Sequence, residues 1–458
     1  MQVRGTRLQE ELSPLMEAIT DLIETFVSNI RRGKLGPRDG KSLSMTAASE
    51  TVQLMHDVIS LFRGFKVRPC NASSTEEGVH VMSCRQVHRL LSLTSFAGDA
   101  LLRAQFGTLM LTNVTRRVLS FIRRAADENK VISAFSESPK ARQADCLGSR
   151  RREASGTCAP TYEENKIEVG EDEDDDVHIQ DILTVGIPGG QTLRRAPSRR
   201  ELEDVERDTD GQVRVDDFFN CVFQHIEQFR AEIEGMNDAL CDRAAKQLNP
   251  TDTVITIGCS HTTQRYLLHA LSSGTSFKVI ILEGAPLLSK SSHMLAEELR
   301  ASHADVQVLP DSSTFAVMGT CTKVLIGAES VLANGGLLAH IGTHPLCIAA
   351  KHFAVPVLVA TTTLKMSPFY PSDAYCTSLV KISRSSAQEI PWNTYGSPGD
   401  VLPEPHGAEV ETLGAVVVHS PVTEYVPPEL ITLYATNESE YTPSQIHRIV
   451  RENYNPED

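Results

Sequence analysis

The sequence has no long hydrophobic run. Across its 458 residues, no apolar stretch approaches the ~18 residues that a membrane-spanning helix needs. The first residues, MQVRGTRLQEELSPL, also lack the apolar core of a signal peptide. These absences argue against a membrane anchor or a secreted product, and we expect a soluble protein in the cytosol of the cytoplasm.

Cysteine spacings typical of metal or disulfide frameworks are absent too. The 10 cysteines are scattered, and no two of them stand in a CxxC arrangement. A zinc ribbon or a secreted disulfide scaffold is therefore not indicated, and reduced thiols are the simpler expectation. Three neighbouring histidines, His340, His344 and His352, show no metal-ligand spacing. We predict no metal site.

Nucleotide-binding motifs and excess positive charge are likewise missing. Neither GxxxxGK[ST] nor GxGxxG occurs, and the adjacent Ser260 and His261 lack the GxSxG setting of a hydrolase nucleophile. The formal net charge is −15, whereas a nucleic-acid-binding surface needs Lys and Arg that neutralise phosphates. The sequence thus predicts no cofactor and no direct contact with nucleic acid, and it suits a basic protein partner better.

The first part of the chain carries the apolar period of helices. Residues 8–30 have one apolar face, and the same period returns in a long helix that starts at Val215. Residues 136–211 have blocks of like charge instead, which is typical of disorder. We predict a helical domain over 1–135, a disordered charged insertion over 136–211 and a long helix over 212–248 that completes the helical domain. Its other helices are expected from about Thr46, at 87–106 and at 108–126.

From Thr253 onward, short apolar strands alternate with helices. This alternation predicts an α/β fold: an N-terminal helical domain followed by a Rossmann-like, mostly parallel-sheet domain over 249–458. Strands are expected at 253–258, 277–283, 305–309, 323–328, 355–360 and 415–419, and helices at about 262–272, 291–302, 342–353 and 443–454.

Two loops should meet at the carboxyl edge of this sheet, where α/β folds place ligand sites. In IGCSHTTQ, residues 257–264, Cys259 precedes a helix amino terminus that can lower the pKa of a thiol, although a small residue at a tight turn is the simpler reading. In the second loop, Glu329 offers a carboxylate that could share proton transfer with Cys259, or simply cap a backbone or meet a partner subunit. Thr343 is predicted to be the N-cap of the helix that follows.

The sequence GAESVLANGGLLAHIGTH (327–344), with KMSPFYP and VPPELITLYATN further on, resembles a known family. This family joins the regulatory subunits of eukaryotic translation initiation factor 2B with ribose-phosphate isomerases, whose second loop reads GADRxxxNGDxxNKIGT. By this resemblance, the catalytic aspartate falls on Glu329, the arginine on Ser330 and the catalytic cysteine on or beside Cys259. The relict pocket loop consists of Gly258, Asn334, Gly335 and Thr343.

The departures from the isomerase pattern indicate a non-catalytic branch. Glutamate in place of aspartate moves the carboxylate by about 1 Å, which catalysis tolerates poorly. Ser330 and the pair Ala339-His340 remove the arginine and lysine that a sugar phosphate would need. The resemblance therefore implies no catalytic residue, with Cys259 and Glu329 as relict isomerase positions. The alternatives are an active isomerase of the methylthioribose-1-phosphate type and a scaffold for an unrelated assembly.

The closing sequence, residues 424–458, is most similar to the regulatory branch whose members pair with the delta subunit of initiation factor 2B. The resemblance implies a regulatory subunit of a guanine-nucleotide exchange factor. Its partners would be the delta, alpha, gamma and epsilon subunits, with exchange activity in epsilon. It would also contact the alpha subunit of initiation factor 2 and help to sense the phosphorylation of that subunit.

Overall fold

The computed structural model describes most of the chain outside one long segment. The predicted charged insertion at 136–211 lies outside the described residues. The described ranges are 2–31, 43–66, 82, 84–104, 109–128, 215–373, 378–382, 387–390, 395–401 and 417–455.

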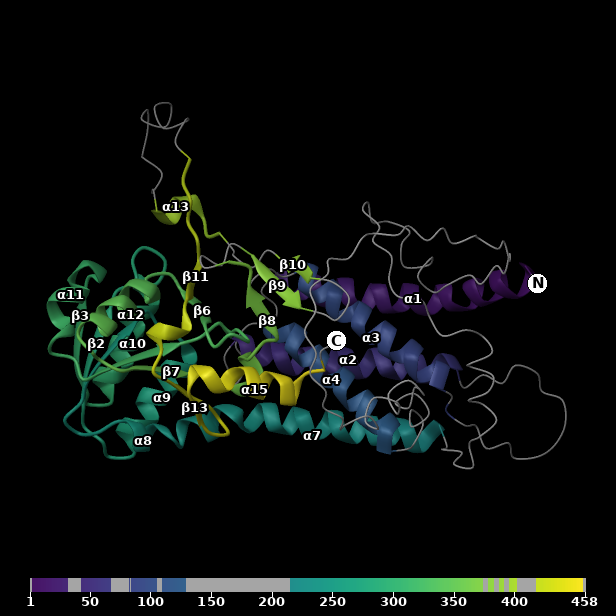
Figure 1. Ribbon diagram of the computed structural model, residues 1–458, viewed down its shortest axis with the longest axis horizontal. Coiled ribbons are helices and arrows are strands. Elements are labelled where there is room, and N and C mark those ends of the chain that lie inside the picture. The colour runs from purple at the N-terminus through teal and green to yellow at the C-terminus, as the bar shows by residue number, and fades with distance from the viewer. Residues whose placement is uncertain are drawn as a thin grey trace, which may run out of the picture.

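The described N-terminal part is helical, as the apolar period predicted (Figure 1). Its helices turn their apolar faces toward one core, and on the last of them this face includes the fully buried Phe218, Val222 and Ile226. The helices are α1 (Gln2–Arg31), α2 (Leu43–Lys66), α3 (Cys84–Ala104), α4 (Leu109–Glu128) and α7 (Val215–Cys241). In the described residues, no helix is both long enough and apolar enough to cross a bilayer.

The second part is built on a seven-stranded sheet with the order β13-β12-β7-β4-β1-β2-β3. All neighbouring pairs are parallel except β12 and β13. The chain runs from β1 outward to β3 and then returns to β4 on the other side of β1, so the strand order reverses between β1 and β4. The strands are β1 (Thr253–Ile257), β2 (Lys278–Leu282), β3 (Asp305–Leu309), β4 (Lys323–Gly327), β7 (Val357–Ala360), β12 (Leu433–Ala435) and β13 (Glu440–Tyr441).

Helices cover both faces of this sheet, as the alternation of elements predicted. Successive strand residues point to opposite faces, so Val254 and Ile255 of β1 enter different hydrophobic clusters. One face packs against α9 (His261–Ser272) and α10 (Ser289–Ala301), next to the short α8 (Ala244–Gln247). The other face packs against α11 (Thr314–Met318), α12 (Thr343–His352) and α15 (Pro443–Asn453).

The strand predicted at 415–419 is wrong where the structure describes it. Residues 417–420 form no strand, and Val417 is 78% exposed. The strand of this region is β11 (Thr423–Val426), which pairs with β6 (Leu337–His340) next to β5 (Ser330–Val331). The prediction failed for residues 417–419 because they have strand composition, but in the described structure they pair with no neighbouring strand. A further small sheet contains β8 (Phe369–Pro371), β9 (Leu379–Ile382) and β10 (Ala387–Ile390), and α13 (Pro398–Val401) follows it.

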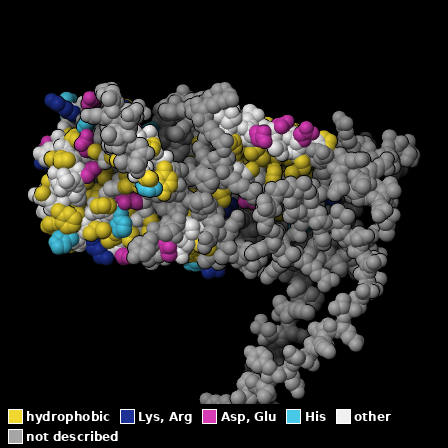
Figure 2. Space-filling view, turned by 90° about the horizontal axis from the view of Figure 1, so that it is seen from above, with side chains coloured by type: hydrophobic (Ala, Val, Ile, Leu, Met, Phe, Trp, Pro, Cys, Tyr) yellow, Lys and Arg dark blue, Asp and Glu magenta, His cyan; other side chains and the backbone are white. Residues whose placement is uncertain are grey.

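The long α7 connects the two parts of the molecule. Its apolar residues from Phe218 to Met236 lie in the helical core, whereas Leu240 near its end belongs to a core cluster of the sheet. Figure 1 shows α7 running beneath the helical part and reaching α8 and α9 at the sheet. Figure 2 shows one face of the molecule, on which the Lys and Arg side chains drawn in dark blue are scattered among hydrophobic and acidic ones.

Candidate functional site at the carboxyl edge of the sheet

The loop after β1 places Cys259 beside the point where the strand order reverses. Gly258 has a φ of +63°, and a Cβ there would lie 2.5 Å from Cδ1 of Leu288, so this turn requires glycine. The half-buried Cys259 thiol donates to Oε1 of Gln264 at 3.7 Å, and Gln264 in turn donates to Glu298. Burial, and to a lesser degree the charge of Glu298, raises the pKa of Cys259 to about 11. At neutral pH this residue is therefore a protonated thiol, not an activated thiolate.

Glu329 follows β4 and lies near two basic side chains, Lys365 and His340. Lys365 is only 6% exposed, and its Nζ donates to the backbone oxygen of Ala328 at 2.7 Å. Burial lowers the pKa of both Lys365 and His340, and the negative charge of Glu329 opposes both shifts. The sheet edge thus keeps a basic side chain beside its carboxylate, but Lys365 supplies it from a later segment than the lysine of the isomerase pattern.

Ser330, at the position of the isomerase arginine, is fully buried in β5. Its Oγ lies 3.0 Å from Oγ of Ser367 and 3.2 Å from the backbone oxygen of Lys365. Asn113 of α4 donates from Nδ2 to Ser367 Oγ at 2.8 Å and to the backbone oxygen of Leu364 at 2.9 Å. Ser330 therefore belongs to a buried chain of hydrogen bonds that joins the sheet edge to the helical part.

The turn at Asn334 and Gly335 is held by side chains of the same protein. Asn334 donates to the hydroxyl of Tyr425 at 2.8 Å, and its Oδ1 accepts the backbone N–H two residues later at 3.0 Å. Gly335 has a φ of +84°, and a Cβ there would collide with the backbone oxygen of Pro443. The hydroxyl of Tyr434 donates to the Gly335 oxygen at 2.8 Å. The polar groups of these residues hydrogen-bond within the protein and fix the shape of the loop.

The helix α12 begins differently from the prediction. Its N-cap is Gly342, with a φ of +93°, and not Thr343, because the chain enters the helix through a left-handed conformation that glycine adopts easily. Thr343 is the first helical residue, and its hydroxyl donates to the backbone oxygen of His340 at 2.6 Å. The Glu424 carboxyl group from β11 accepts the backbone N–H of His344 at 2.7 Å, and those of Gly342 and Thr343 as well. The protein thus fills this anion-attracting helix end with its own side chain.

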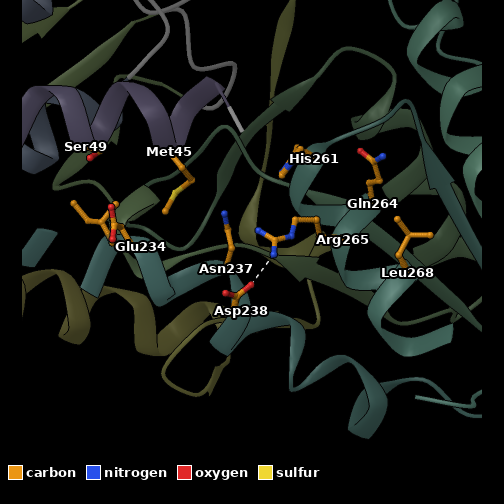
Figure 3. Close-up of a pocket in the computed structure, with 10 residues that line it drawn as sticks. Met45, Ser49, Glu234, Asn237, Asp238, His261, Gln264, Arg265 and Leu268 are labelled. Carbon is orange, nitrogen blue, oxygen red and sulfur yellow. Dashed lines mark hydrogen bonds and ion pairs between the residues drawn. The ribbon is translucent and has the colours of Figure 1, made fainter. Parts of the chain in front are cut away.

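A cavity of about 400 Å³ lies where α9 meets α2 and α7 (Figure 3). Its wall includes Ser49 of α2 and the ion pair between Arg265 of α9 and Asp238 of α7, whose atoms are 2.6 Å apart. Gln264 also lines it, so the cavity adjoins the loop that carries Cys259. Neither Cys259 nor Glu329 lies on its wall. The cavity is therefore separate from the predicted pair.

The predicted residues share one edge of the sheet but do not form one constellation. Within the described part of the chain, no hydrogen bond links Cys259 to Glu329, and their polar neighbours differ. Sequence reasoning missed Lys365 and Glu424. A signal for the first existed in KMSPFYP, where a lysine stands among apolar residues. Glu424 lies in a short strand sequence, TEYV, that gives no hint of a helix cap elsewhere.

Comparison with known proteins decides the family. The model of the initiation factor 2 subunit family matches residues 82–443. The chain belongs to this family. The resemblance deduced from residues 327–344 is thereby confirmed, and the helical part from residue 82 onward lies within the same match.

The relatives of known sequence include both branches of this family. A translation initiation factor eIF2B subunit beta from Dictyostelium discoideum is 34% identical over 237 residues, which are 52% of this chain and 56% of that protein. The same subunit from Schizosaccharomyces pombe is 27% identical over 381 residues, or 81% and 86% of the two chains. A ribose 1,5-bisphosphate isomerase from Haloterrigena turkmenica is 26% identical over 226 residues, or 49% and 65%. The branch favoured by residues 424–458 is thus confirmed as the beta branch.

Solved structures agree with the fold. eIF2B beta from Chaetomium thermophilum has a TM-score of 0.55 at 20% identity, covering 97% of this chain and 96% of that one. A chain of the tetrameric eIF2B-beta2-delta2 complex from C. thermophilum has a TM-score of 0.53 at 19% identity, covering 97% and 98%. At these identities the likeness concerns the fold, and it confirms a helical part followed by a mostly parallel sheet.

Proposed function

We propose that this chain is a non-catalytic regulatory subunit of the exchange factor for initiation factor 2, in the beta position. One observation carries the proposal: the edge that holds the catalytic loop in the isomerase pattern is filled by this protein's own side chains. Ser330 is fully buried in a hydrogen-bond chain to Asn113, and Glu424 covers the amino terminus of α12. The beta-subunit relatives support the same position.

The proposed assembly follows from the same relatives. The chain pairs with a delta subunit through its sheet part, and a beta–delta tetramer is the assembly named for one protein of the same fold. Alpha, gamma and epsilon subunits complete the factor, and epsilon performs the guanine-nucleotide exchange. The chain works in the cytosol and helps to sense phosphorylation on the alpha subunit of initiation factor 2. The domain limits 1–135 with 212–248, and 249–458, are part of this proposal.

A sugar-phosphate isomerase is the second candidate. It is favoured by the H. turkmenica relative and by the survival of Cys259 and Glu329 near the basic Lys365. Against it stand the pKa of about 11 for Cys259 and the separate surroundings of the two side chains. In this proposal the relict loop residues Gly258, Asn334, Gly335 and Thr343 have kept only their role in backbone shape.

Affinity capture of the tagged full-length chain from its own cells tests the assembly. We expect the delta, alpha, gamma and epsilon subunits to be recovered in fixed proportion, and initiation factor 2 to be recovered more weakly. Capture of the chain without any of these subunits would contradict the proposal, and it would favour a scaffold in another assembly.

An isomerase assay on the purified chain tests the alternative separately. Ribose 1,5-bisphosphate and methylthioribose-1-phosphate are supplied, and product is followed by NMR. We expect no turnover above the rate of a Cys259→Ala variant. Turnover that the Cys259→Ala substitution abolishes would establish isomerase activity and contradict the proposal that the chain is non-catalytic.

A further inference from the structure

Three side chains with metal-binding atoms gather where the end of α4 meets the first half of α7. Cys221 and His225 lie four residues apart on α7, so they share one face of that helix. Glu128 is the last residue of α4, next to this face. The Cys221 sulfur lies 3.4 Å from Oε2 of Glu128 and 3.7 Å from Nδ1 of His225. One ligand atom from each residue fits within a span of 4.8 Å.

These separations are close to the edges of a tetrahedral zinc site. Bonds of about 2.3 Å to sulfur and about 2.0–2.1 Å to nitrogen and oxygen give ligand-to-ligand edges of roughly 3.3–3.6 Å. Both sulfur distances, 3.4 Å and 3.7 Å, differ from these edges by no more than small side-chain rotations can supply. The ligand atoms of Glu128 and His225 lie within 4.8 Å of each other, so the site closes around a metal ion when side-chain rotation shortens this third edge.

The surroundings of the cluster position each ligand. Arg124, one turn before Glu128 on α4, binds the other carboxylate oxygen, Oε1, at 3.0 Å and leaves Oε2 directed at the sulfur. The ring of His225 stacks on Phe121 with a centroid distance of 5.9 Å and an interplanar angle of 19°, which fixes its plane. Cys221 and His225 are half-buried and Glu128 is exposed, so a metal can enter from solvent and keep a water as its fourth ligand.

A catalytic role suits this arrangement less well. In a Cys–His–carboxylate triad, the acid holds the far nitrogen of the imidazole and the imidazole activates the thiol. Here the carboxylate contacts the sulfur itself, and its negative charge opposes formation of the thiolate. A bound metal ion would offset the repulsion between the thiolate and the carboxylate, because its positive charge attracts both groups.

We propose that Glu128, Cys221 and His225 form a zinc-binding site. A thiolate and an imidazole select a borderline-soft transition-metal ion over Mg²⁺ or Ca²⁺, which prefer oxygen ligands only. The site links residues that are 93 positions apart, at the end of α4 and in the first half of α7. Bound zinc clamps these two helices together and lowers the free energy of the folded state relative to the unfolded chain.

Cobalt titration of the full-length chain tests the site. The purified protein is stripped with EDTA, kept reduced with a phosphine, and titrated with Co²⁺. We expect thiolate-to-cobalt charge-transfer absorption and the intense visible bands of tetrahedral cobalt, both of which Zn²⁺ displaces. Cys221→Ser should abolish the charge-transfer band. Glu128→Gln, at an exposed position that tolerates change, should weaken cobalt affinity by more than about 100-fold, beyond the usual cost of losing a group outside the ligand shell.

Matched variants separate this site from other thiols of the chain. Cys259→Ser replaces a cysteine of similar burial and should leave the cobalt spectrum unchanged. Arg124→Ala removes the group that orients the Glu128 carboxylate but keeps all three ligands, so it should weaken binding much less than Glu128→Gln. Far-UV circular dichroism checks folding, and Zn²⁺ should raise the melting temperature of the wild type but not of Cys221→Ser. Absence of the charge-transfer band with cobalt in large excess, its persistence in Cys221→Ser, or an unchanged cobalt affinity in Glu128→Gln would overturn the proposal.

Discussion

The two half-buried cysteines Cys221 and Cys259 show how the same residue type differs between two regions. Cys259 stands where the isomerase pattern places a catalytic thiol, yet its polar neighbours are Gln264 and, beyond it, Glu298. Cys221 stands where that pattern assigns nothing, yet it contacts both an imidazole and a carboxylate. Side chains with metal-binding atoms thus lie together at Cys221, whereas the hydrogen-bond partner of Cys259 is the neutral Gln264. A family motif therefore locates the position of a catalytic thiol in the isomerase pattern, and it does not indicate which cysteine of this chain contacts potential metal ligands.

The sheet edge and the end of α4 also differ in their exposure to solvent. At the edge, Ser330, Ser367 and Asn113 are fully buried and hydrogen-bonded together. At the end of α4, Glu128 is exposed, and the cluster opens to solvent. Buried hydrogen bonds at this edge thus connect the helical part to the sheet. Binding of a ligand from solvent is more favourable at the cluster of Glu128, Cys221 and His225 than at the sheet edge.

Restoring the isomerase arginine should have the largest effect on this contrast. Ser330→Arg places a guanidinium at a position with no exposed surface, where a buried charge without a partner costs several kcal/mol. We expect the free energy of unfolding to fall by more than about 3 kcal/mol in urea titration. Ser330→Ala, which loses only the hydroxyl, should cost about 1 kcal/mol. An arginine variant with wild-type stability would mean that the edge is an open cleft.

Removing the carboxyl group of Glu424 should have a smaller effect at the same edge. Glu424→Ala leaves the amino terminus of α12 without its acceptor, and we expect a loss of about 1–2 kcal/mol in urea unfolding. Glu424→Gln keeps an acceptor oxygen and should cost less. If the alanine variant is as stable as the glutamine variant, the helix end does not depend on this contact.

The pH dependence of the Gln variant isolates the titration of Glu424. Burial raises its pKa above the ordinary value of 4.5, although the three backbone N–H groups oppose the shift. The folded state therefore binds this proton more tightly than the unfolded state, so the contribution is complete below pH 4.5 and is lost as pH rises through the folded pKa. The stability of the wild type relative to Glu424→Gln should fall across that window. A parallel pH profile for the two proteins would show that the pKa of Glu424 is the same in the folded and unfolded states.

The fold was predictable because its elements follow local periods. The apolar face of α7 and the buried runs of β1 and β4 depend on spacing within one segment, and the structure confirms them. The strand predicted around Val417 was wrong because a strand needs a partner strand, which local composition does not reveal. The prediction of the α12 cap was wrong for a similar reason. The side chain that accepts the backbone N–H of His344, Glu424, comes from a strand that is distant in the sequence.

The sites were harder to predict than the fold. The position of Ser330 could be deduced from the isomerase pattern, but its bonding to Ser367 and Asn113 depends on how α4 packs against the sheet. The candidate metal ligands Glu128, Cys221 and His225 have no spacing in the sequence that is typical of a metal motif. Glu128 and Cys221 are 93 residues apart, and only the packing of α4 against α7 brings them into contact.

The smallest expected effect concerns the reactivity of the two cysteines themselves. Zinc bound at Cys221 should slow its alkylation by iodoacetamide several-fold, because the coordinated sulfur lone pair is no longer available for attack. Cys259 has Gln264 as its hydrogen-bond partner, and among the described residues it belongs to no group of potential metal ligands, so its rate should not change. Mass spectrometry of digested samples, taken over time with and without Zn²⁺, gives both rates from one reaction. Glu128→Gln should remove most of the protection at Cys221. Equal slowing at both cysteines would show that zinc acts on the protein as a whole, and the contrast between the two regions would then be lost.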